Sequence, residues 1–95
     1  MIDYLTWKSK EAKELYSAIL KLKGADEVAM FLRDLCTAEE ISEMAKRWQA
    51  AKMLNQEKSY REIAKKTGLS TTTVTRVAQW LKSGKGGYKL ALSKK

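Results

Sequence analysis

The sequence predicts an all-α fold in a single domain, and three observations support that prediction. The chain has 95 residues, the size of one domain, and it contains no proline. Apolar residues make up 44% of it and recur at three- and four-residue spacing over most of its length. Candidate capping residues and glycines divide this pattern into segments. We therefore expect a series of helices followed by a short tail.

The first half of the chain predicts three amphipathic helices. Their segments are residues 7–23, 25–36 and 37–55. Gly24 is expected to end the first helix, and Thr37 with Glu40 forms a capping box at the start of the third. The apolar faces are broader than the small helices that follow can cover. Residues 7–55 are therefore expected to be the dimerisation helices of a homodimer, and a monomer that closes on itself is the alternative.

Residues 59–82 predict a helix-turn-helix. A capping box of Ser59 and Glu62 opens the first short helix. Gly68 lies five residues after the apolar Ile63, where the chain must reverse and a positive φ favours glycine. Apolar residues follow six and nine positions after the glycine, at helical spacing. This combination is more specific than a helix–glycine–helix turn alone.

The polar residues of this segment are typical of a DNA-binding surface. Cations on the first helix are expected to contact phosphates, and hydroxyls at the start of the second to reach base edges, directly or through water. The candidate DNA-binding residues are Arg61, Lys65, Lys66, Ser70, Thr71, Thr72, Thr73 and Thr75. The alternative is that the threonines form a merely solvated face. Because threonine is a poor helix former, four threonines at a helix start favour the functional interpretation.

The charge is unevenly distributed along the chain. Residues 1–45 carry 6 Lys and Arg against 9 Asp and Glu, whereas residues 46–95 carry 13 against 2. The net charge of +11 in the second half coincides with the predicted helix-turn-helix, as expected of a phosphate-binding surface. A membrane surface is the competing partner. It is disfavoured because no basic helix has a broad aromatic face, and no apolar run approaches the ~20 residues of a membrane span.

Catalytic and metal-binding classes find little support in the composition. The chain has no histidine and a single cysteine, Cys36, so a zinc site lacks ligands and an intrachain disulfide is excluded. The carboxylates lie mostly at predicted helix starts, where capping explains them. Nothing at the start of the chain resembles a signal peptide. We therefore predict no enzyme, no metal and no cofactor, in a cytoplasmic protein.

Two runs of sequence carry a resemblance to a known family. They are TAEEISEMAKRW (residues 37–48) and YREIAKKTGLSTTTVTR (residues 60–76). Both resemble the Trp repressor superfamily, and the helix order of nearly the whole chain is similar to its YerC/YecD branch of Trp repressor-related proteins. The resemblance implies one Trp repressor-like domain over residues 1–95, an intertwined homodimer of the bacterial cytoplasm that binds operator DNA.

From the residues and the resemblance together we expect a sequence-specific transcriptional regulator of double-stranded DNA, in particular a repressor. Its helix-turn-helix would occupy residues 59–82. Residues 83–95 would form a basic tail that either ends in a short helix or is disordered. The alternative function is a helix-turn-helix module for protein interaction or sigma-factor-like contacts, because the run SYREIA resembles that class as well.

The resemblance also implies an effector pocket. Trp repressor holds the tryptophan indole between two arginines, and the matching positions here hold Arg47 and Arg76; Thr37 matches a position that lines the pocket. Guanidinium planes stack well on an aromatic ring. Val77 replaces the family's glycine, however, and Trp80 replaces a small serine. We hypothesise that Trp80 fills the pocket or blocks L-tryptophan. The alternative is that Trp80 is a core residue and that both arginines contact phosphates.

Overall fold

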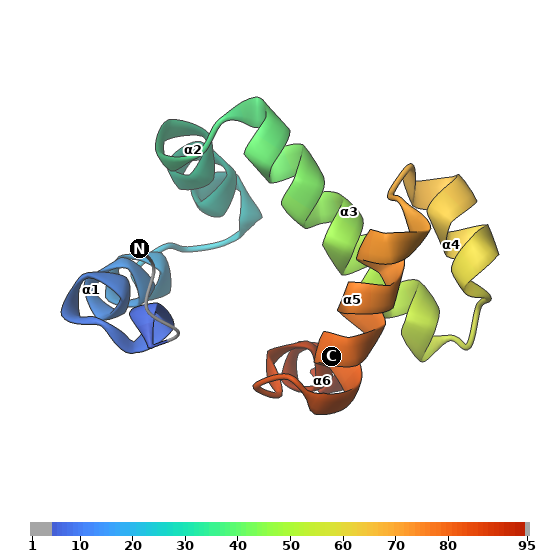
Figure 1. Cartoon of the computed structure of the whole chain (residues 1–95). Helices are drawn as coiled ribbons and strands as arrows, with labels where there is room; N and C mark the ends of the chain where they lie inside the picture. Colours follow the sequence, from blue (N-terminus) through green and yellow to red (C-terminus); the bar gives the residue numbers. More distant parts are fainter. Residues whose placement is uncertain (1–4, 95) are drawn as a thin grey trace. The chain divides into compact units, whose positions relative to one another are not determined.

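The structure, a computed structural model, describes residues 5–94, and this range is helical apart from its turns and ends (Figure 1). The elements are η1 (Thr6–Lys8), α1 (Lys10–Leu20), α2 (Ala25–Leu35), α3 (Ala38–Asn55), α4 (Tyr60–Thr67), α5 (Thr71–Ser83) and α6 (Gly87–Ser93). The chain divides into two compact units, residues 1–37 and residues 38–95. The all-α prediction is confirmed, whereas the description as one domain stays a prediction.

In the first unit, Ser9 separates the 3₁₀ turn η1 from helix α1. The extended backbone of Ser9 and its Oγ, which accepts a hydrogen bond from the Ala12 amide at 3.1 Å, make it the N-cap of α1. The Tyr16 hydroxyl donates to the Trp7 carbonyl oxygen at 2.8 Å and ties η1 to α1. The helix predicted over residues 7–23 is therefore shorter than expected and begins after Ser9.

Gly24 begins α2 instead of ending α1, which corrects the sequence prediction. Helix α1 ends at Leu20, and Gly24 adopts a φ of +88° as the residue before α2. A positive φ is readily available to glycine and strained for most other residues. The Glu27 carboxylate reaches back to accept from the Lys23 amide at 2.9 Å, which stabilises this start.

The apolar side chains of α1 and α2 have no core of their own within residues 5–37. No residue of η1, α1 or α2 is buried. Leu20 is 84% exposed, Met30 is 69% exposed and Leu35 is 52% exposed. Apolar surface of this extent on short helices is typical of an interaction surface.

The second unit is built around α3, which packs against α4, α5 and α6. Its fully buried side chains include Ile63 of α4 and Val74 and Val77 of α5, which meet the small residues Ala50 and Ala51 of α3. These alanines let α4 and α5 approach α3 closely. The contacts of α4 and α5 with α3 therefore hold these two helices in place.

The tail contains a short helix, one of the two arrangements left open by its sequence. Gly84 makes the tight turn after α5, where a Cβ would lie only 2.4 Å from the Trp80 carbonyl oxygen. The chain then turns into α6, which packs on α5 and α3. Tyr88 of α6 stacks on Trp48 of α3 with ring centroids 6.4 Å apart. Residue 95 lies outside the described range.

Within residues 5–94, the structure contains no helix of the length and apolar character needed to cross a membrane.

Candidate nucleic-acid interface

Helices α4 and α5 are two short helices joined by a tight turn at Gly68, in the segment for which the sequence predicts a helix-turn-helix. The Ser59 Oγ accepts from the Glu62 amide at 3.1 Å and caps the start of α4. Gly68 ends α4 in the left-handed region, with φ +80°, and its amide donates to the Ala64 carbonyl at 2.9 Å. The two sequence signals, the cap and the glycine, therefore lie where the prediction placed them.

Thr67 fixes the turn between the two helices. Its Oγ1 donates to the Ile63 carbonyl at 2.7 Å and accepts from the Leu69 amide at 3.2 Å. The Leu69 side chain is buried in the core below. Because both helices are attached to one clamped turn, their relative orientation is preorganised. The sequence offered only a weak signal for this role, a hydroxyl directly before the turn glycine.

The hydroxyls at the start of α5 divide into two groups. The Ser70 Oγ caps α5 by accepting from the Thr73 amide at 3.1 Å and also donates to the Thr73 Oγ1, while the Thr75 Oγ1 donates to the Thr71 carbonyl at 2.9 Å. Thr71 and Thr72 are exposed, and their hydroxyls form no hydrogen bond with the rest of residues 5–94. These two side chains are therefore the ones most available to an external partner.

The three cations of α4 face different surroundings. Arg61 and Lys65 are exposed and four residues apart, so they share one face of the helix. Lys66 is also exposed, and its Nζ lies 3.9 Å from the Glu62 Oε2. An exposed ion pair of this kind is weak and breaks easily. Arg61 and Lys65 thus present the more available positive charge.

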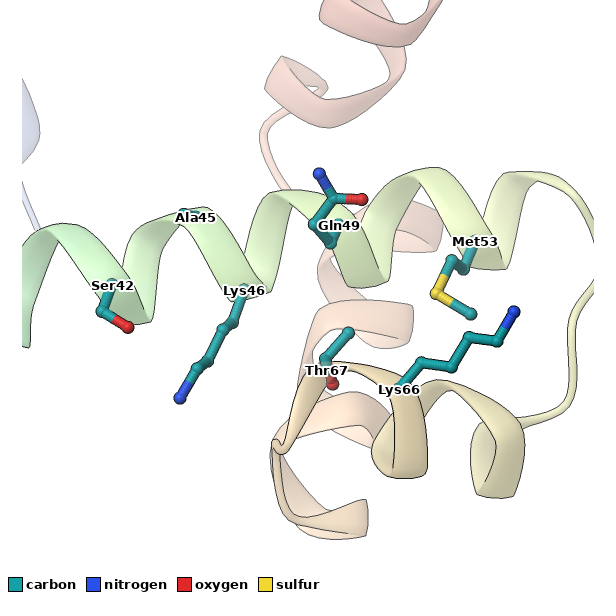
Figure 2. A pocket seen from close by; sticks show the side chains of 7 residues that line it. All are labelled: Ser42, Ala45, Lys46, Gln49, Met53, Lys66 and Thr67. Carbon is teal, nitrogen blue, oxygen red and sulfur yellow. The ribbon is translucent and has the colours of Figure 1, made fainter. Parts of the chain in front are cut away.

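Lys46 of α3 is a basic residue outside the set of DNA-binding residues predicted from the sequence. Its Nζ lies 3.9 Å from the position that a Cβ on Gly68 would occupy, so the side chain reaches the turn between α4 and α5. Figure 2 shows Lys46 extending from α3 on the side where α4 ends. One feature of the sequence could have indicated Lys46: it is the first residue of the basic half of the chain, residues 46–95.

Of the predicted effector residues, Arg47 lies on α3, and Arg76 and Trp80 lie on α5. Arg47 of α3 is half-buried; its Nε lies 3.5 Å from the Glu43 Oε2 and forms no hydrogen bond with any residue from 5 to 94. Burial raises the pKa of the Tyr88 hydroxyl above its ordinary value, and the Arg47 guanidinium lowers that pKa in part. Arg76 is exposed on α5.

Trp80 lies one turn after Arg76 and lines a cavity of about 610 Å³ together with Tyr88 and the α5–α6 turn. Its side chain is 48% exposed, so it is not part of the core of the second unit. Thr37 belongs to the first unit. The two-arginine pocket, and the hypothesis that Trp80 fills it, both stay predictions.

Comparisons with known proteins place this geometry in a family. The family model described as Trp repressor protein matches residues 10–95. The chain is 39% identical over 87 residues to the uncharacterized protein YerC of Bacillus subtilis (strain 168), covering 92% of this chain and 84% of that protein.

Two solved structures have the same fold. A TrpR-like protein from Eubacterium eligens ATCC 27750 is 41% identical with a TM-score of 0.86, covering 90% of this chain and 89% of the other. A candidate Trp repressor from Staphylococcus aureus is 36% identical with a TM-score of 0.85, covering 96% and 92%. These matches confirm the predicted Trp repressor-like fold and the resemblance to the YerC branch. The chain belongs to the Trp repressor family, a family of DNA-binding regulators and not of enzymes.

Proposed function

We propose that the chain is a sequence-specific transcriptional regulator, a repressor, that binds double-stranded DNA as a homodimer in the bacterial cytoplasm. The observation that carries this proposal is the pair Thr71 and Thr72, which are exposed at the start of α5 and whose hydroxyls form no hydrogen bond with the described part of the chain, residues 5–94. The start of the second helix is the part of a helix-turn-helix that contacts base edges in the major groove.

Two kinds of contact would contribute to DNA binding: contacts to phosphates and contacts to base edges. Arg61, Lys65 and Lys66 on α4 neutralise phosphates and set the position of the protein on the duplex. Thr71 and Thr72 contact base edges, directly or through water, and give the sequence preference. Ser70, Thr73 and Thr75 support this role by holding the first turns of α5 in place.

A homodimer accounts for the apolar surface of the first unit. Helices α1 and α2 are amphipathic, but no residue on either of them is buried. A second copy of the chain would cover these faces and remove them from water. It would also provide a second α5, which a two-fold symmetric operator requires, with the two recognition helices ~34 Å apart.

Leu20→Glu is expected to weaken the dimer strongly and to leave the second unit folded. Leu20 is 84% exposed, so a glutamate disturbs nothing within its own unit. Each subunit of the proposed dimer would lose one buried leucine at about 1.5–3 kcal/mol, so the two losses together should weaken dimerisation by at least about a hundredfold. Sedimentation velocity over a range of concentrations measures the shift. Ser17→Glu, an exposed polar position on the same helix, is the matched control and should leave the dimer unchanged.

The proposed function is tested by selection from random duplex DNA, followed by anisotropy titration of the selected duplex at two salt concentrations. We expect a palindromic sequence whose affinity falls steeply with salt, because a dimer contacts several phosphates at each half-site. Binding that is weak and independent of sequence would contradict the proposal. That result would favour the helix-turn-helix as a protein-interaction module.

A further inference from the structure

A groove lies between α3 and α4 on the second unit, apart from the exposed start of α5. It has a volume of about 460 Å³, within the range of small-molecule sites. Its lining comes from five residues of α3 and two of α4: Ser42, Ala45, Lys46, Gln49, Met53, Lys66 and Thr67. Figure 2 shows Lys46 and Lys66 on opposite sides of Thr67, with Met53 beside the Lys66 side chain.

The lining combines an apolar floor with positive charge. Ala45, Met53 and the methyl group of Thr67 offer apolar surface, and none of the lining residues is acidic. Lys46 forms no ion pair with any residue in the range 5–94. The carboxylate that pairs with Lys66 is that of Glu62, outside the groove, at 3.9 Å. An anionic ligand would therefore find two cations without displacing a strong internal pair.

We propose that this groove binds a small amphipathic anion, a carboxylate carried on an apolar body. The apolar body would cover Ala45 and Met53, and the carboxylate would pair with Lys46 or Lys66. A DNA phosphate is a poorer occupant because it has no apolar surface to place against the floor. Ser42 and Gln49 supply neutral polar groups at the edge of the groove.

Occupancy of the groove would lower the affinity for DNA, an effect that rests on the proposed function. Lys66 is both a lining residue and a candidate phosphate contact, so a bound carboxylate competes for its charge. Thr67, also in the lining, clamps the turn that positions α5. Because coupling between two sites is reciprocal, DNA should weaken binding of the anion by the same factor.

The probes are phenylacetate, phenethyl alcohol and phenethylamine, which share a shape and differ in charge. Each is titrated into the full-length protein without DNA while NMR follows the methyl signals of Ala45 and Met53. Phenylacetate should give saturable shifts and bind about threefold to fivefold more tightly than the alcohol, with the amine weaker still. Lys46→Gln and Lys66→Gln should each reduce this preference. Lys58→Gln, an exposed lysine outside the groove, should preserve it.

One further variant and a DNA titration complete the test. Ala45→Leu keeps both charges, fills the floor at an exposed helical position and should abolish phenylacetate binding. Equal affinity for the three probes, or no saturable shift, would overturn the proposal. If Lys46→Gln lowered the affinity for DNA while the wild-type protein did not bind phenylacetate, the groove would be a phosphate contact. This result would also overturn the proposal. Phenylacetate binding by a chain without DNA affinity would uphold the groove and reject the proposed function.

Discussion

Ile63→Ala should lower the free energy of unfolding of the second unit by about 2–4 kcal/mol. Ile63 is completely buried where α4 meets α3 and α5, and its backbone carbonyl also accepts the Thr67 hydroxyl that clamps the turn. The shorter side chain leaves a cavity where α3, α4 and α5 meet, and small cores relax only partly around such a cavity. The loss is a large fraction of the stability of a small domain.

Urea denaturation followed by circular dichroism measures this change. Lys65→Ala on the same helix is the control, because an exposed substitution of this kind stays within about 0.5 kcal/mol. If Ile63→Ala were as mild as the control, α4 would not be held by the core described above. Contacts other than those of Ile63 would then have to hold α5 in position.

The double variant Arg61→Gln, Lys65→Gln should lose most of its affinity for DNA of any sequence. Both side chains are exposed on one face of α4, and neither forms an ion pair with another residue in the range 5–94. A homodimer carries each change twice and so loses four phosphate contacts. At about 0.9 per contact, the slope of the logarithm of the binding constant against the logarithm of the salt concentration should become less negative by about 3.6. Near ~0.1 M salt, affinity should fall by about a thousandfold or more.

Anisotropy titrations at several salt concentrations measure both quantities. The matched control is Lys10→Gln, Lys13→Gln, which removes the same charge from an exposed face of α1. An equal loss of affinity in the control would show that net charge alone drives binding. The assignment of phosphate contacts to α4 would then be wrong.

The two short helices α4 and α5 and the turn between them could be predicted well because their signals are local. Ser59 caps a helix three residues before Glu62, and Gly68 adopts the positive φ that its position in the turn requires. Ile63, Val74 and Val77 are buried as their spacing indicated. The cap, the positive φ and the apolar spacing each depend on residues that are close together in the sequence. The sequence alone is therefore enough to predict them.

Other predictions were wrong or incomplete for two reasons. Some residues suit more than one local structure, and others are brought together only by tertiary contacts. Gly24 suits either the end of one helix or the start of the next, and the structure shows the second use. The hydroxyl of Thr75 is engaged within its own helix, which spacing alone does not reveal. Lys46 and Lys66 share a groove although 20 positions separate them, so only the packing of α3 on α4 brings them together.

The measurement that tests sequence-specific recognition most directly compares Thr72→Ala with the wild type on the selected duplex and on a scrambled duplex. Thr72 is exposed and its hydroxyl is unused inside the described fold, so its loss should leave folding intact. We expect the preference for the selected duplex to fall by about tenfold or more, with scrambled-duplex affinity and salt dependence unchanged. An equal loss of affinity for both duplexes would contradict base recognition by the start of α5.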